Sequence, residues 1–404
     1  VLQDSGYNAD KYSEALLFAE TAVTHDPEFL LAQVMVANLH SSVYWIGTDV
    51  SESRRLQAKQ ELDKAIALAP TAPEVLAAQG EYFYRIMLDF ETALKYQLMA
   101  YQKKPNDGEI IQALGMTQRR LGLWDQAIAS FLKADELEPN DLNNLSTAIE
   151  SLEMLGKYDA MQELLDHALT RFPNSSDLGA MAVGLPIAKE GDLIKARAVF
   201  QKITANAGGA YVSTTINLLF LERNFTKVIE ILNSQEMIEF YDNYPASLHL
   251  EKGLTYLFLN QQEAAILELN KAVDILTPIE DEHDAFNYAL TLSVLGSAKA
   301  LLGEYEAAYQ IAKESMQHFP LAKDHADGPI IHNFAVHIIA LAGYRDEALQ
   351  LIKTMLNTPG GFKRWELQLD PRWDFFRDDE RFNQLIKPAN FDQSMHANKE
   401  QQNP

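Results

Sequence analysis

The chain has 404 residues, 47% of them apolar, and carries 34 Lys and Arg against 57 Asp and Glu, which gives a formal net charge of −23. The apolar fraction supports a continuous core and excludes wholesale disorder. The acidic balance argues against nucleic-acid binding by this chain and against docking on an anionic membrane. The absence of cysteine excludes disulfides, zinc–thiolate sites, iron–sulfur clusters and a cysteine nucleophile.

The sequence shows no signal for membrane insertion. No apolar run approaches the ~18 residues that a membrane-spanning helix requires. The first ten residues are polar and lack the apolar core of a signal peptide. Because the chain begins at Val1 rather than at Met, we expect a processed chain or a piece of a larger protein. The compartment stays open between the cytoplasm and, with an upstream membrane segment, the periplasm.

Prolines that close helical segments recur along the first half of the chain. Each follows an apolar, alanine-containing stretch, and the successive spacings are 43, 35, 34 and 34 residues. A proline suits a helix end because it cannot extend the hydrogen-bond ladder and disfavours helix in its predecessor. A period near 34 residues with helical periodicity resembles tetratricopeptide repeats. The prolines are Pro27, Pro70, Pro105, Pro139 and Pro173.

One segment, residues 108–139, carries the whole repeat pattern. Small residues in it would let two antiparallel helices approach closely, and Phe131 would fill the space between them. The apolar positions of the second helix fall on one face, at spacings of four and three residues. The pattern residues are Leu114, Gly115, Gly122, Trp124, Ala127, Phe131, Ala134 and Pro139. This segment sets the register of the other units.

We therefore predict an all-α fold, a tetratricopeptide-like α-solenoid of about ten stacked antiparallel helix pairs with an atypical C-terminal cap. The predicted parts are an N-terminal array at 1–236, a continuing array at 237–361 after an expected bend, an aromatic capping segment at 362–389 and a polar tail at 390–404. Nine residues beyond one repeat fall in 41–55, between the two helices of an early unit.

The C-terminal segment breaks the repeat pattern and is rich in aromatic residues. A solenoid would otherwise expose an apolar face at its end, so we expect this segment to cap the last helix pair. Asp370 before Pro371 is expected to open one turn, and Asp378 with Asp379 a final helix. The aromatic residues are Phe362, Trp365, Trp373, Phe375, Phe376 and Phe382.

Residues 367–386, LQLDPRWDFFRDDERFNQLI, resemble the end of a class of bacterial tetratricopeptide regions that follow a Ser/Thr kinase, a nucleotide cyclase or a winged-helix regulator. The stretches DPEFLLAQVMVANLH and EIIQALGMTQRRLGLWDQAI are similar to earlier repeats of these proteins. The resemblance implies the sensory or regulatory region of a bacterial signalling protein. The chain has no Gly-rich phosphate loop and no HRD-type or DFG-type sequence, so no catalytic or DNA-binding residue carries over.

The candidate site follows from the repeat register. In tetratricopeptide arrays the first helix of each pair lines the concave surface, and the register predicts a basic spot there with aromatic and Met neighbours. Arginine in such company suits an extended peptide that carries a carboxylate. The alternative is that the arginines pair with Glu81 and Glu109 and bind no partner. The Lys/Asn clamp of chaperone-tail binders is absent at these positions. The predicted groove residues are Tyr84, Arg85, Gln112, Met116, Arg119 and Arg120.

Two other classes of function remain as alternatives. The region from His283 to His337 holds five of the ten histidines, and His325, Asp327, His332 and His337 could suggest a metal-dependent or catalytic site. However, His332 and His337 are five residues apart and do not share a helix face as i,i+4 ligands would. No G-x-S-x-G or H-E-x-x-H motif occurs.

We therefore predict no metal, no cofactor and no enzymatic activity, and a protein or peptide as the partner. A self-assembling structural protein is the third reading. It rests on the aromatic terminal segment, and it makes self-association an expectation.

Overall fold

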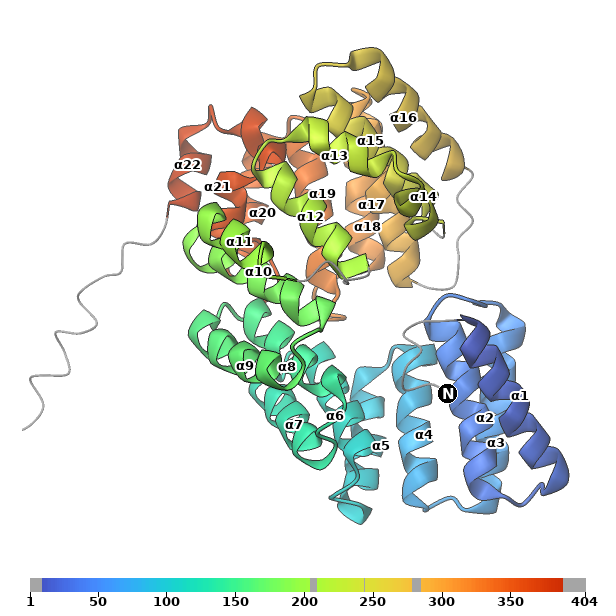
Figure 1. Ribbon diagram of the computed structural model, residues 1–404. Helices are drawn as coiled ribbons and strands as arrows, with labels where there is room; N and C mark the ends of the chain where they lie inside the picture. Colours follow the sequence, from blue (N-terminus) through green and yellow to red (C-terminus); the bar gives the residue numbers. More distant parts are fainter. Residues whose placement is uncertain (1–8, 204–208, 243, 278–284, 388–404) are drawn as a thin grey trace, which may run out of the picture. The chain divides into compact units, whose positions relative to one another are not determined.

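The computed structural model describes residues 9–203, 209–242, 244–277 and 285–387, and every regular element in these ranges is helical (Figure 1). The predicted all-α class is therefore confirmed there. None of these helices is long and apolar enough to cross a membrane. The chain forms two compact units. Unit 1 comprises the described residues up to Phe172, 285–292 and Glu314–Ile331; unit 2 comprises the other described residues.

Unit 1 stacks helical pairs in chain order, with each pair packed against the next. Three further helices contribute parts to both units: α17 (Ala285–Leu301), α18 (Tyr305–His318) and α19 (Gly328–Leu341). The helices of the first 172 residues are α1 (Ala9–His25), α2 (Leu30–Trp45), α3 (Glu52–Leu68), α4 (Pro73–Tyr82), the π-helical turn η1 (Phe83–Met87), α5 (Phe90–Lys103), α6 (Gly108–Arg120), α7 (Trp124–Leu137), α8 (Leu142–Met154) and α9 (Tyr158–Arg171).

The close approach of α6 and α7 confirms the predicted role of the small residues. A Cβ added to Gly115 would lie 2.8 Å from the Phe131 ring, which is too close for ordinary packing. Ala127, Phe131 and Ala134 are fully buried against it. The turn between the helices needs a left-handed residue, which Gly122 supplies with φ +72° at little cost.

The π-helical turn η1 explains why one repeat spacing is 35 residues rather than 34. A π turn adds one residue to a helix without changing the direction of the chain. Phe83–Met87 places this extra residue at the end of the first helix of its pair, and Leu88 then adopts a left-handed conformation with φ 49°. The earlier excess in 41–55 is divided among the last turn of α2, the connection that follows it and the first turn of α3.

Unit 2 continues the same pairing from α10 to α16 and ends in the C-terminal helices. The stretch 237–245, expected to interrupt the period, contains the short helix α14 and the start of α15. The helices are α10 (Ser176–Glu190), α11 (Leu193–Phe200), α12 (Gly209–Leu221), α13 (Phe225–Leu232), α14 (Gln235–Phe240), α15 (Pro245–Phe258), α16 (Gln262–Ile275), α20 (Arg345–Met355), α21 (Arg364–Leu369), the 3₁₀ turn η2 (Pro371–Phe376) and α22 (Glu380–Ile386).

The C-terminal segment does more than cap the last pair, because it also packs on the first helices of unit 2. Helix α21 lies beside α10 (Figure 1). Leu369 joins the cluster that holds Val183 and Leu218, and the Trp365 ring would meet a Cβ added to Gly191 at 2.6 Å. Arg223, in the turn before α13, forms an ion pair with Asp374 at 2.5 Å.

The expected helix starts in this segment are confirmed. The Asp370 carboxylate accepts the backbone N–H of Arg372 at the start of η2, and the Asp379 carboxylate accepts that of Arg381 at the start of α22. The rings of Trp373, Phe376 and Phe382 are buried, so they are packed into unit 2 rather than displayed to another molecule. Self-association stays a prediction, without these three rings to support it.

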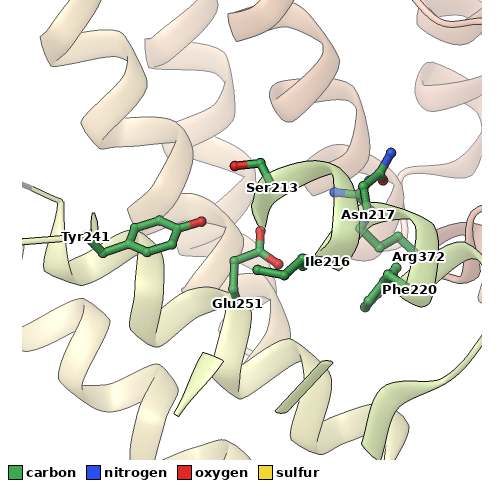
Figure 2. Close-up of a pocket in the computed structure, with 7 residues that line it drawn as sticks. All are labelled: Ser213, Ile216, Asn217, Phe220, Tyr241, Glu251 and Arg372. Atoms are coloured by element: carbon green, nitrogen blue, oxygen red, sulfur yellow. The ribbon is translucent and has the colours of Figure 1, made fainter. Parts of the chain in front are cut away.

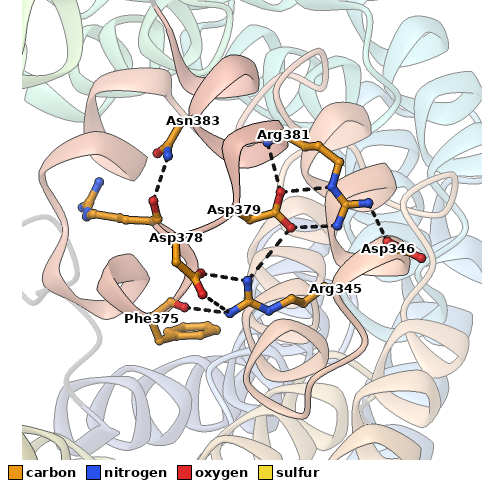
Figure 3. A network of polar contacts seen from close by, with 8 residues as sticks. Arg345, Asp346, Phe375, Asp378, Asp379, Arg381 and Asn383 are labelled. Atoms are coloured by element: carbon orange, nitrogen blue, oxygen red, sulfur yellow. Dashed lines mark hydrogen bonds and ion pairs between the residues drawn. The ribbon is translucent and has the colours of Figure 1, made fainter.

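A polar network fixes α22 to α20 (Figure 3). Arg345 of α20 pairs with Asp378 at 2.8 Å and donates to the Phe375 carbonyl at 3.0 Å. Arg381 bridges Asp379 and Asp346, each at 2.7 Å. Asp379 lies between the two arginines, which hold its pKa down at about 2, with Arg381 the larger cause. Asp379 therefore keeps its charge, and with it both ion pairs, across the whole neutral range.

Candidate functional site

The six predicted groove residues lie on two neighbouring elements of unit 1. Tyr84 and Arg85 belong to η1, and the other four lie on α6. The repeat register thus brings them to successive first helices, as expected. Their exposure differs widely, however, and it separates them into two groups.

Tyr84 and Arg120 are buried, so the expectation that they are exposed on the groove surface is wrong. Their exposed fractions are 5% and 8%. Arg120 forms ion pairs with Asp324, at 2.6 Å, and with Asp327, and its Nε donates to the Tyr84 hydroxyl at 2.9 Å. The guanidinium also lies over the ring of Trp45, at 5.3 Å from the centroid. All these residues belong to unit 1.

The charge balance of this buried cluster keeps Arg120 protonated. Burial by itself would lower the pKa of Arg120, but Tyr84 and the two carboxylates raise it well above its usual value. Burial raises the pKa of Asp324; Arg120 opposes this shift and the charge of Asp327 adds to it. One cation serves two acids here, so removing it would leave both without their counter-ion.

The acids of this cluster come from the connector between α18 and α19. Asp324 also accepts the backbone N–H groups of Ala326 and Asp327, which folds the connector into a tight turn. The His325 N–H donates to the Arg120 carbonyl at 2.9 Å. The sequence suggests Asp327 only as a candidate metal ligand. Its ion-pair partner is 207 residues away in the chain, and no local pattern marks such a pair.

Arg85 and Arg119 remain partly exposed, and their ion pairs are more accessible to solvent than the pair of Arg120 with Asp324. Arg85 binds Glu81 at 2.7 Å, as the alternative reading expected, and donates to the Ser42 hydroxyl. Arg119 pairs with Glu150 of α8 at 3.1 Å, rather than with the expected Glu109. A second Arg119 nitrogen lies 3.8 Å from the Met154 sulfur, and its Nε has no hydrogen-bond partner among the residues that the structure describes.

The remaining two predicted residues flank Arg119 on the same helix. The Gln112 amide donates to Asp141 at 3.5 Å, which is a long hydrogen bond. Met116 is partly buried and packs against two apolar clusters, one with Tyr84 and Phe90 and one with Phe131. The partly exposed face of α6 therefore offers one basic, one amide and one thioether side chain.

The histidine region does not form a metal site in the described ranges. No group of three His, Asp or Glu side chains there is placed to hold an ion. His283 lies outside the described residues. The ring of His325 lies against Gly122 in unit 1. His337 lies in unit 2, where its Nε2 is 3.1 Å from the Arg372 carbonyl and burial lowers its pKa to about 4.

Two segments of the chain match a known repeat family. A tetratricopeptide repeat model matches residues 108–141 and 246–275. In both segments the eighth residue is a glycine in close contact with the twenty-fourth: Gly115 with Phe131, and Gly253 with Leu269 at 2.6 Å from an added Cβ. The two matches therefore share the same helix-packing contact in the structure.

Solved structures are similar at low identity. A tetratricopeptide repeat protein from Parabacteroides merdae is 17% identical, over 67% of this chain and 98% of its own, with a TM-score of 0.45. PilF from Pseudomonas aeruginosa is 14% identical, over 64% of this chain and 98% of its own, with a TM-score of 0.37. No curated protein sequence matches the chain.

Proposed function

We propose that this chain, which contains tetratricopeptide repeats, is a non-enzymatic scaffold that binds an extended, carboxylate-bearing segment of a partner protein on the inner face of unit 1. Such repeats generally serve protein interaction, and stacked pairs of helices form extended concave binding surfaces. The proposed contact residues are Arg85, Gln112, Met116 and Arg119, which keep part of their surface exposed. Binding there would be non-covalent and would need little reorganisation.

The observation that carries this proposal is the incomplete pairing of Arg119. Its side chain is 15% exposed, whereas Glu150, its one carboxylate partner, is 44% exposed. The Glu150 carboxylate is thus partly hydrated, so its side of the pair can be released to water. A carboxylate on a bound peptide can replace Glu150 at small cost, and a planar guanidinium can accept it through two N–H groups.

The next residue of the same helix supports the chemical class of the ligand. Arg120 holds two aspartates of an irregular segment of the chain, with aromatic rings beside it. Unit 1 therefore already binds one acidic segment of its own chain through an arginine of this helix. Arg119 presents the same group to a segment supplied by a partner.

Fluorescence polarisation with labelled peptides would test the proposal. Peptides with a free C-terminal carboxylate and internal acidic residues are titrated with the full chain, with Arg119→Glu and with Lys95→Glu. Lys95 is exposed on α5 and gives the same change of charge away from the inner face. We expect Arg119→Glu to weaken binding at least tenfold and Lys95→Glu to leave it unchanged. Equal losses in both variants would contradict the proposal. Arg120→Glu is unsuitable, because it would disrupt the buried cluster.

We further propose that the chain is the regulatory region of a larger bacterial signalling protein. The resemblance of residues 367–386 to the ends of such regions supports this, and that segment is a packed part of unit 2. Intact-mass and peptide mass spectrometry on the native protein from its source cells would test it. We expect a mass well above 45.5 kDa with peptides upstream of Val1. A mass near 45.5 kDa would contradict it and indicate a free-standing adaptor.

A further inference from the structure

Unit 2 contains a small pocket that the proposed groove does not use (Figure 2). Its volume is about 170 Å³, below the ~300–1,000 Å³ typical of pockets for drug-sized ligands. Four elements meet around it: helix α12, the end of helix α14, helix α15 and the C-terminal turn η2. The lining residues are Ser213, Ile216, Asn217, Phe220, Tyr241, Glu251 and Arg372.

The pocket brings together two opposite charges that do not pair with each other. Arg372 forms its ion pair with Asp370, at 2.7 Å, and its side chain is still 39% exposed. The charges that reach the Glu251 carboxylate are those of Arg372 and Asp370. Burial raises the pKa of Glu251, the charge of Arg372 opposes that shift, and the charge of Asp370 adds to it. Glu251 is thus a half-buried acid without a direct counter-ion in the described part of unit 2.

The position of Arg372 is fixed before any ligand arrives. Its carbonyl lies 3.1 Å from the His337 Nε2, and its guanidinium is oriented by two nitrogens on Asp370 and by the Phe220 ring, 5.7 Å away. Arg377 donates to the Asp370 carbonyl at 3.0 Å, which braces the same turn. A preorganised cation of this kind binds an anion without a large entropic cost.

Hydroxyl and amide groups complete the lining, and apolar side chains form one wall. In Figure 2 the Tyr241 and Ser213 hydroxyls lie near the Glu251 side, and Asn217 lies near Arg372. Ile216 and Phe220 supply the apolar surface. A matching ligand therefore needs a cationic end, an anionic end and a small apolar body.

We propose that this pocket binds a free amino acid, with its ammonium group against Glu251 and its carboxylate against Arg372. The apolar wall favours an aliphatic side chain of the ligand. A ligand without the ammonium group would leave Glu251 uncompensated, and one without the carboxylate would gain no contact from Arg372, so both would bind more weakly. This site does not depend on the groove of unit 1.

Isothermal titration calorimetry on the full, unaltered chain tests the assignment. Each of the twenty standard L-amino acids is titrated separately. For the tightest one, the C-terminal amide and the N-acetyl derivative are titrated as well. We expect saturable binding of one molecule per chain, strongest for an aliphatic amino acid, and at least tenfold weaker binding of both blocked forms. No saturable heat with any amino acid, or equal binding of a blocked form, would overturn the proposal.

A matched pair of variants locates the site. Glu251→Gln keeps the size of the side chain and removes its charge, and we expect at least a tenfold loss of affinity. Glu263→Gln is the control, since Glu263 is exposed on α16 of the same unit and lies outside the pocket. Equal affinities in the two variants would overturn the assignment to Glu251. The blocked ligands are measured on the unaltered chain, so the test holds even where a variant folds poorly.

Discussion

Arg120 of helix α6 in unit 1 and Arg372 of the turn η2 in unit 2 both form ion pairs with aspartates, but their surroundings differ. Arg120 is 8% exposed and meets two aspartates and a tyrosine hydroxyl. The Arg372 side chain is 39% exposed, meets one aspartate and faces a pocket that also holds Glu251. The difference teaches that an arginine satisfied by its own chain is part of the fold, whereas one beside an unpaired acid can serve a ligand.

The largest expected effect comes from removing the satisfied arginine. Arg120→Met leaves Asp324, whose side chain is 2% exposed, and Asp327 without a counter-ion. Breaking a buried pair from one side costs about 3–5 kcal/mol, and we expect that loss in urea unfolding followed by circular dichroism. Arg55→Met is the matched control: its pair with Glu52 is open to solvent on both sides, so we expect ~0–1 kcal/mol. Similar losses in both variants would show that the buried pairs of Arg120 contribute no more to stability than a solvent-exposed pair.

The second effect is a loss of stability of unit 2 at acidic pH. The folded-state pKa of His337 is about 4, below its ordinary value of 6.5, because burial disfavours the charged ring. Its contribution to stability is therefore complete above pH 6.5 and is lost as the pH falls toward 4, by up to ~3 kcal/mol. His337→Gln retains a donor for the Arg372 carbonyl. It should reduce the dependence of the unfolding free energy on pH between about 6.5 and 4. Urea unfolding from pH 7 to 4 measures it, with exposed His25→Gln as a control that should keep the wild-type slope.

The repeat contact itself can be tested with two glycines. Gly115→Ala would place a Cβ 2.8 Å from the Phe131 ring, so we expect a loss of about 1–3 kcal/mol from overpacking. A Cβ added to Gly184, within helix α10, would meet no atom within 4 Å. Gly184→Ala should therefore gain up to ~1 kcal/mol from helix propensity. Changes in the unfolding free energy that have the same sign for the two variants would contradict the packing account.

The smallest expected effect sharpens the pocket side of the comparison. The raised pKa of Glu251 means that its charged form is less favourable in the folded chain than in the unfolded chain. Stability is thus complete below the unfolded pKa of about 4.5 and is reduced as the pH rises through the folded-state pKa. Glu251→Gln should raise the melting temperature slightly at pH 7 and leave it unchanged near pH 4. A lower melting temperature at pH 7 would show that the charge is paired after all.

The sequence predicts the repeat fold well because its signals are local. The spacing of Pro105 and Pro139, and the small residues at Gly115 and Ala127, fix the helix pairs and their close contact. The burial and ion pairing of Arg120 could not be predicted, because its partner Asp324 is 204 residues away and lies in a connector. The same holds for Arg372, which reaches α12 through a terminal segment that sequence reasoning had assigned only to the last helix pair.

The measurement that tests the central proposal most directly is hydrogen-exchange mass spectrometry of the full chain, with and without its tightest carboxylate-bearing peptide. The account predicts slower exchange in Gly108–Arg120 and Leu142–Met154, the two helices joined by the Arg119–Glu150 pair. The Arg119→Glu variant should lose that protection. Protection confined to other helices, with these two unchanged, would contradict the assignment of the groove.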